Sequence, residues 1–174
     1  MRERVGSRGV FMVKVGIGQD SHRIQDPSRG KALVLGGVVL PESYALEGNS
    51  DSDVVLHAIA NAISGITGRP ILGPVADALC KAGTTDSAAY LQKGLEDLDA
   101  TGYRITHISV TLECLRPKIL PHLAAMVSRI ADLAGVGVED VGITATTGEG
   151  LTDFGKGLGV QGFACVTAMR SEAG

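Results

Sequence analysis

The segment Leu158–Met169 constrains the fold most, because its pattern predicts a β-strand that is apolar on both faces. The apolar residues are Val160, Ala164 and Val166 on one face, and Phe163, Cys165 and Met169 on the other. Successive side chains of a strand point to opposite faces of the sheet, so both faces of this strand need a cover. We expect helices to cover one face of the sheet and another subunit to cover the other.

Strand and helix patterns alternate along the rest of the chain. Apolar residues recur at every second position in the predicted strands and at helical spacing in the predicted helices. Extended segments are expected at 13–18, at 32–40 with a break at Gly36–Gly37, at 108–112 and at 141–145. Helices are expected from Ser50, after the capping residue Asp86, and over 119–134. Residues 71–81 fit either a short helix or a loop, since Gly and Pro surround them. This order favours an α/β fold, a two-layer domain with one mixed β-sheet. Residues 1–12 are interpreted as a flexible leader and 13–174 as a single domain.

Charge and composition exclude several classes of function. The net charge is −3, and no basic patch of the kind that binds nucleic acid is visible. Three Phe, three Tyr and no Trp leave few platforms on which bases could stack. No apolar run approaches the length that a membrane span needs, and no signal-peptide pattern opens the chain. We therefore expect a cytoplasmic protein, and the interior of an organelle after processing is the alternative. Three widely spaced cysteines without a CxxC pair predict no disulfide framework.

The first candidate site is the segment Asp20-Ser21-His22. Residues two apart in an extended chain project to the same face, so this carboxylate and this imidazole can share a divalent cation. His57, in the helix expected to begin at Ser50, offers a third ligand of a type that zinc takes. Asp53 lies one helical turn before His57 and is expected to orient its imidazole. A simple Asp20–His22 pair at a strand end remains the alternative.

Two further segments have the composition of phosphate sites. Ser50 is expected to begin a helix, and a helix N-terminus offers free N–H groups to phosphate. Thr146, Thr147 and Glu149 end a predicted strand and enter a Gly-rich turn, where hydroxyls and a carboxylate can hold phosphate and a second cation such as magnesium. An ordinary capped helix and an ordinary polar turn are the alternatives. The segment 116–121 is a proline-stiffened loop that contains Lys118.

These segments, taken in order, resemble one family: the 2-C-methyl-D-erythritol 2,4-cyclodiphosphate synthases. The resemblance runs from about Val15 to Met169, through GIGQDSHRI, LGGVVLP, NSDSDVVLHAIANAISG, RPKILP and ITATTGEGL. It implies an enzyme of non-mevalonate isoprenoid biosynthesis that cyclises 4-diphosphocytidyl-2-C-methyl-D-erythritol 2-phosphate and releases CMP. It also implies a homotrimer with active sites between subunits, each using zinc or another divalent cation together with Mg²⁺ or Mn²⁺.

The resemblance also implies roles for individual residues. Asp20, His22 and His57 match the zinc ligands, Glu149 matches the residue at the second cation, and Asn49 and Thr147 match positions that support the transition state. Asn49 replaces a histidine found in many members of the family. The residues implied to contact the substrate are Asp20, His22, Asn49, Ser50, Gly73, Cys114, Lys118, Ile119, Leu120, Thr146, Thr147, Glu149 and Lys156.

Two other functions fit the same residues. A zinc-dependent phosphohydrolase would use water at an open metal position and release inorganic phosphate. A non-catalytic trimeric nucleotide-binding protein would keep the fold but not the turnover. The segment 69–79 motivates this second alternative, because it departs from the family pattern and clearly retains only Gly73.

Overall fold

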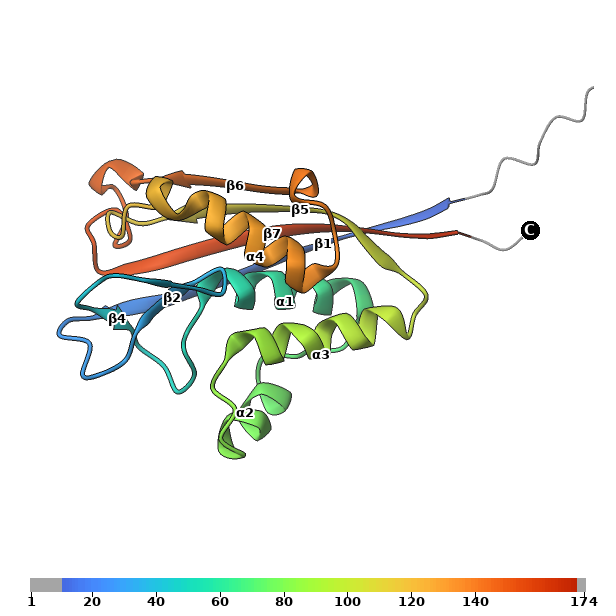
Figure 1. The fold of residues 1–174 in the computed structure, drawn as a ribbon, viewed down its shortest axis with the longest axis horizontal. Coiled ribbons are helices and arrows are strands. Elements are labelled where there is room, and N and C mark those ends of the chain that lie inside the picture. The colour runs from blue at the N-terminus through green and yellow to red at the C-terminus, as the bar shows by residue number, and fades with distance from the viewer. Residues whose placement is uncertain (1–10, 172–174) are drawn as a thin grey trace, which may run out of the picture.

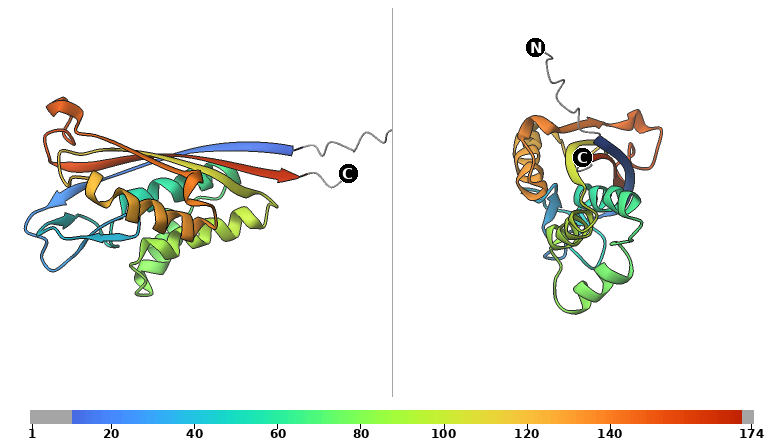
Figure 2. Two further views of the ribbon diagram at one scale, coloured as in Figure 1. Left: turned by 45° about the horizontal axis from the view of Figure 1, so that its top comes forward. Right: turned by 90° about the vertical axis from the view of Figure 1, so that its right-hand side faces the viewer.

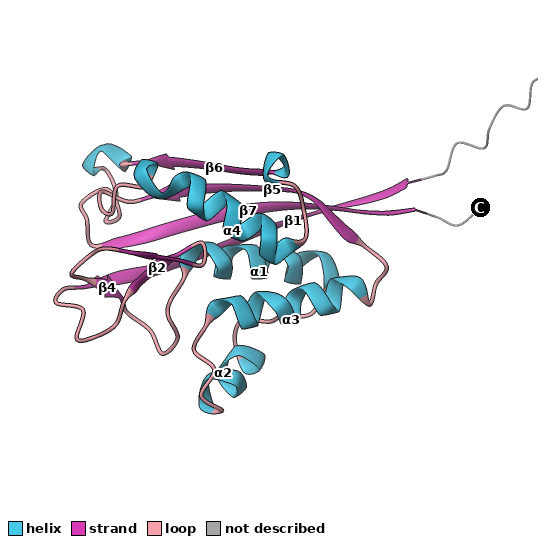
Figure 3. Cartoon of the chain, viewed as in Figure 1, coloured by secondary structure: helices cyan, strands magenta, loops and turns pink. Residues whose placement is uncertain are grey.

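The fold is built on one five-stranded sheet, which the computed structural model places in the order β4-β1-β7-β5-β6 (Figures 1 and 3). The structure describes residues 11–171. The strands of the sheet are β1 (Phe11–Gln25), β4 (Ala45–Leu46), β5 (Arg104–Glu113), β6 (Val141–Thr146) and β7 (Gly159–Ser171). Strand β7 is antiparallel to both of its neighbours, whereas β5 and β6 are parallel. The predicted α/β fold with a mixed sheet is therefore confirmed.

Four α-helices accompany the sheet in the described part of the chain: α1 (Val54–Thr67), α2 (Pro74–Lys81), α3 (Ser87–Asp99) and α4 (Leu123–Ala134). Short 3-10 turns cover Leu120–His122, Val138–Asp140 and Gly148–Gly150. Helices α1 and α4 contact the sheet, and α3 packs on α1 (Figure 2). None of the helices in the described residues is long and apolar enough to cross a membrane.

Strand β7 is covered on one face and open on the other within a single chain. Val160, Ala164 and Val166 are buried beneath the helices, as expected. Phe163 on the opposite face is 43% exposed. The neighbouring strand β1 begins at Phe11, which pairs with Ser171, two residues before the start that the sequence pattern predicts at residue 13. Residues 1–10 lie outside the described part.

The start of α1 differs from the prediction. Asp53, and not Ser50, is the N-cap, because its carboxylate accepts hydrogen bonds from the Val55 and Leu56 N–H groups at 3.0 and 3.1 Å. The same carboxylate accepts from the N–H groups of Gly36 and Gly37 at 2.9 and 2.6 Å. These glycines form the positive-φ turn of a hairpin between β2 (Leu33–Leu35) and β3 (Val38–Leu40). Asp53 thus joins the hairpin to the helix.

Helix α1 lies directly on β1 because two glycines of the strand face it. A Cβ atom at Gly16 would overlap the carbonyl oxygen of Ala62, and one at Gly18 would overlap that of Ala58. The absence of side chains at both positions sets the distance between helix and strand. Asp20 and His22 continue the same face of β1 toward the start of α1.

A single methyl group should disturb this contact. We expect Gly16→Ala to lower the free energy of unfolding by about 1–3 kcal/mol or more, because the helix backbone must move away from the strand. Gly65→Ala on α1 is the matched control, since its nearest neighbour would be the Ile17 carbonyl oxygen at 3.9 Å. Alanine favours the helix, so this control should be neutral or stabilising. Denaturant unfolding of both variants tests the contrast, and equal stabilities would contradict it.

Candidate functional site

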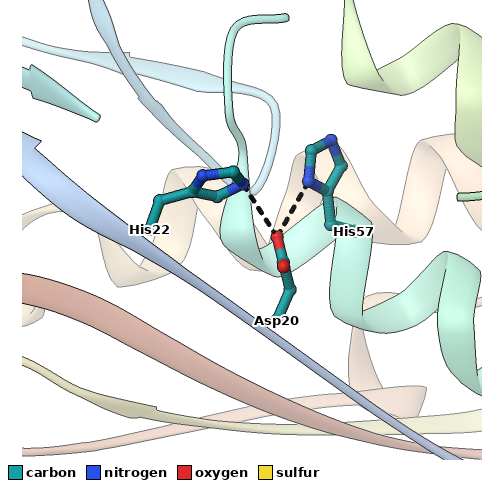
Figure 4. A group of neighbouring side chains, drawn as sticks. All are labelled: Asp20, His22 and His57. Atoms are coloured by element: carbon teal, nitrogen blue, oxygen red, sulfur yellow. Dashed lines mark hydrogen bonds and ion pairs between the residues drawn. The ribbon is translucent and has the colours of Figure 1, made fainter. Parts of the chain in front are cut away.

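Three side chains that could together hold a metal ion, Asp20, His22 and His57, converge where β1 passes the first turn of α1, and we call them the metal-binding group (Figure 4). The Asp20 Oδ2 atom lies 3.1 Å from His22 Nε2 and 2.8 Å from His57 Nδ1. The ligand atoms of the three residues all lie within 4.8 Å of one another. Two imidazole nitrogens and one carboxylate oxygen form a donor set that suits a divalent cation, zinc in particular. The structure therefore brings together the three residues that the sequence analysis selected.

The Asp20 carboxylate is held in its charged form. Burial acts to raise its pKa, but the hydrogen bonds and positive charges of His22 and His57 outweigh burial and hold the pKa at about 2. A carboxylate that stays ionised at neutral pH can bind a cation without first losing a proton.

The second ring nitrogen of His57 faces Ser87 and not Asp53. The His57 Nε2 atom lies 2.8 Å from the Ser87 Oγ atom. Asp53 is fully buried and its carboxylate is occupied by backbone N–H groups, so the expected orienting role of Asp53 is wrong. Ser87 is 30 residues from His57 in the sequence, and no local pattern connects the two.

A cavity of about 330 Å³ opens beside the three side chains. Of the residues expected to contact the substrate, Asn49, Ser50 and Gly73 line it together with the metal-binding group. Asp77, from the segment that departs from the family pattern, and Tyr90, which no sequence pattern singled out, also line this cavity. The Tyr90 ring stacks on His57 with a centroid distance of 6.1 Å. Tyr90 lies among apolar residues of a helix, so the sequence does not indicate that it lies beside His57, and only the fold shows this.

Lys31 fixes the loop that carries Asn49 and Ser50. Its Nζ atom donates hydrogen bonds to the carbonyl oxygens of Leu46 and Gly48 at 2.8 and 3.2 Å, and to Ser52 Oγ at 2.6 Å. Partial burial lowers the pKa of Lys31, and the nearby Asp51 charge acts in the opposite direction. The sequence analysis missed this lysine because it precedes the loop by a whole hairpin.

A second cavity of about 170 Å³ lies at the carboxyl end of β6. The residues that line it include six of those expected to contact the substrate: Cys114, Lys118, Ile119, Leu120, Thr146 and Thr147. Burial raises the pKa of the Cys114 thiol to about 11, so this cysteine is a neutral, buried residue in the wall of the cavity. The two cavities share no lining residue.

Glu149 and Lys156 lie in the turn that follows β6. Glu149 is exposed and adopts a left-handed backbone conformation, with φ of 50°. The Lys156 Nζ atom lies 3.5 Å from Asp153 Oδ1, and both side chains are exposed. In the sheet of one chain, β7 and β5 stand between β6 and the strand that carries Asp20 and His22. The later part of the turn returns to that strand, since Asp153 and Phe154 line a cavity with His22, but Glu149 is not among the residues of this cavity. The structure therefore does not bring Glu149 to the metal-binding group of the same chain.

Comparisons with known proteins identify the family of the chain. The model of the YgbB family matches residues 13–169. A 2-C-methyl-D-erythritol 2,4-cyclodiphosphate synthase of Chlamydia muridarum is 47% identical over 91% of this chain and 89% of its own length. A solved synthase structure is 30% identical, with a TM-score of 0.78 over 89% of this chain and 99% of its own. Another, solved as the CDP-bound form, is 28% identical, with a TM-score of 0.77 over the same shares of the two chains. The chain thus belongs to the YgbB family.

Proposed function

We propose that this chain cyclises 4-diphosphocytidyl-2-C-methyl-D-erythritol 2-phosphate to 2-C-methyl-D-erythritol 2,4-cyclodiphosphate and releases CMP. The observation that carries the proposal is the convergence of Asp20, His22 and His57 beside a cavity lined by Asn49 and Ser50. The relative from Chlamydia muridarum, whose name states this activity, is 47% identical across 91% of the chain.

The reaction needs positioning and charge compensation more than a covalent intermediate. An oxygen of the 2-phosphate attacks the β-phosphorus of the diphosphate, and the bond from that phosphorus to the bridging oxygen breaks, so CMP leaves with the α-phosphate. Both reacting groups belong to one molecule, and holding them folded together can supply much of the rate enhancement. Asn49 and Ser50 line the cavity, and in this proposal they hold the phosphates at its wall. Zinc held by Asp20, His22 and His57 would neutralise charge on the phosphoryl oxygens.

We assign the cytidine end of the substrate to the smaller cavity at the end of β6. Its walls come from the loop between Cys114 and Leu120 and from Thr146 and Thr147. A pocket lined by the apolar side chains of Ile119 and Leu120 suits a base, and Lys118 adds a positive charge beside it. A solved relative that was determined with CDP supports a nucleotide ligand for this family.

The order of the strands supports an active site shared between subunits. Thr147 and Glu149 follow β6, while Asp20 and His22 lie on β1, and two strands stand between them in the sheet. At about 4.8 Å per strand, β1 and β6 are roughly 14 Å apart. We propose that Thr147 supports the phosphoryl group and that Glu149 holds Mg²⁺ or Mn²⁺, both beside the zinc of a neighbouring subunit.

The open face of the sheet supports the homotrimer. Val13, Val15 and Ile17 project from β1 on the face opposite to the helices and are 54%, 58% and 75% exposed in one chain. With Phe163 on β7 they form an apolar surface of a kind that proteins seldom leave open to water. A threefold assembly through this surface would cover it. The cytoplasmic location expected from the sequence stays a prediction.

The first prediction of this function concerns products and metal. Purified protein incubated with the diphosphocytidyl substrate should yield CMP and the cyclic diphosphate, identified by mass spectrometry. It should carry close to one zinc per chain by elemental analysis. His57→Ala removes one of three protein ligands, so it should lose the zinc and the turnover while keeping the fold, as judged by circular dichroism.

Other products would point to other functions. Inorganic phosphate without a cyclic product would identify the phosphohydrolase, and tight CMP binding without turnover would identify the nucleotide-binding protein. Full zinc retention in His57→Ala would refute the ligand assignment.

The second prediction concerns Glu149. Glu149→Gln keeps the size of the side chain but removes the charge that would hold the second cation. We expect kcat to fall by about 10²–10³, as is common when one well-placed stabilising group is lost. Zinc content should stay unchanged. Glu139→Gln is the matched control, because Glu139 is an exposed glutamate in the turn before β6. Normal turnover of Glu149→Gln would show that Glu149 does not hold a second cation that the reaction needs.

The third prediction concerns assembly. Val15→Asp places a charge in the proposed interface and should convert the trimer to monomers in light scattering at micromolar concentration, because a charge buried without a partner is costly. Val138→Asp is the control, since Val138 is exposed to almost the same extent (56%) but lies in the 3-10 turn before β6. A trimeric Val15→Asp variant, or a monomeric wild-type protein, would contradict the proposed interface.

A further inference from the structure

We propose that Ser87, with its proton held by Asp51, is a positioning residue that orients His57 for the metal. The inference rests on the proposed function in one respect, the zinc bound by His57. Neither Ser87 nor Asp51 lies among the residues that the resemblance connects with the metal or the substrate.

The geometry joins three side chains from separate elements. Ser87 is the first residue of α3, and its hydroxyl lies between two partners. The hydroxyl contacts the Asp51 Oδ1 atom on one side and the His57 Nε2 atom, at 2.8 Å, on the other. Asp51 Oδ2 accepts a hydrogen bond from the Ser87 backbone N–H at 3.0 Å. The Asp51 N–H donates in turn to the Thr85 carbonyl oxygen at 2.8 Å, which anchors the carboxylate at the start of α3.

The direction of the protons follows from the chemistry of the groups. A carboxylate only accepts hydrogen bonds, so the single hydroxyl proton of Ser87 points to Asp51. The Ser87 oxygen is then left as an acceptor toward His57 Nε2. A neutral imidazole that carries its proton on Nε2 has its lone pair on Nδ1. The Nδ1 atom lies 2.8 Å from Asp20 Oδ2 inside the metal-binding group, so a bound cation would take the place of the proton that these two atoms share.

Burial makes this acceptor necessary. His57 is 6% exposed and Ser87 is fully buried, so water cannot easily take the place of the serine. A histidine that binds metal through Nδ1 must keep a proton on Nε2, and a buried N–H group without an acceptor is unfavourable. The negative charge of Asp51 polarises the Ser87 hydroxyl, and the more negative hydroxyl oxygen makes the imidazole a better metal ligand. Tyr90, stacked on the ring, limits its rotation.

Zinc affinity measured by chelator competition tests the inference. Ser87→Ala removes the acceptor and should weaken zinc binding about 10–100-fold, the usual effect of losing a partner of a metal ligand. Asp51→Asn keeps the size and can still accept from the Ser87 N–H, but its amide can donate to the Ser87 oxygen. The hydroxyl proton would then turn toward His57 Nε2, so this variant should also bind zinc more weakly.

Ser64→Ala is the matched control. Ser64 on α1 is half-buried, donates to the Ala60 carbonyl oxygen at 2.9 Å and accepts from the Ile71 N–H at 3.2 Å. The Ser64→Ala substitution removes two hydrogen bonds that do not involve the metal-binding group, so zinc affinity should stay at the wild-type value. A spectroscopic measurement separates orientation from general stability. In zinc-loaded protein with ¹⁵N-labelled histidine, the hydrogen-bonded His57 Nε2–H signal should be present in the wild type and shifted or lost in Ser87→Ala.

The outcomes distinguish the inference from the function on which it rests. Wild-type zinc affinity and an unchanged His57 signal in both variants would overturn the role of Ser87 while leaving the zinc site intact. A wild-type protein that binds no zinc at His57 would overturn the zinc assignment, and this inference with it. If Ser87→Ala does not fold, the zinc affinity and the His57 signal of Asp51→Asn decide the question alone.

Discussion

The close contact between α1 and β1 is the constraint on which the rest of the structure depends. Gly16 and Gly18 have no side chains, so the helix backbone rests on the strand at Ala58 and Ala62. The face of β1 that carries Gly16 and Gly18 has no side chains at these two positions, and the next residue on the same face is Asp20. His57 precedes Ala58 on the helix and therefore meets Asp20 at hydrogen-bond distance. The metal-binding geometry is thus a consequence of backbone packing.

The sequence predicts this site only as far as local patterns reach. Asp20 and His22 share a face because they are two apart in a strand, and the mixed α/β fold follows from the order of strand and helix patterns. The helix start at Ser50 is wrong because the run from Ser50 to Asp53 contains four residues that can all cap a helix. The turn of the β2–β3 hairpin decides among them, since its N–H groups bind the Asp53 carboxylate. Such a contact between distant segments leaves no periodic signal.

The contact between Ser87 and His57 is a second one between distant segments that the sequence does not predict. The prediction that Asp53 orients His57 is wrong, and it rests on a helical spacing of four, the only relation that the sequence shows between the two residues. In the fold, the Asp53 carboxylate accepts hydrogen bonds from the β2–β3 hairpin. Ser87, at the start of α3, contacts the Nε2 side of the His57 ring instead. The carboxylate in contact with that serine is Asp51, two residues before the expected one.

The strand order connects the architecture to the proposed assembly. The chain places its metal-binding group at β1 and its Thr147–Glu149 turn after β6, with β7 and β5 between them. The proposed chemistry uses both parts together, so a second copy would have to bring the Thr147–Glu149 turn of one chain to the metal-binding group of another. The exposed valines of β1 lie on the sheet face that such a copy would cover. Burying this apolar face would therefore stabilise the assembly and complete the site in one step, so that an unassembled chain would have neither a covered sheet nor an active centre.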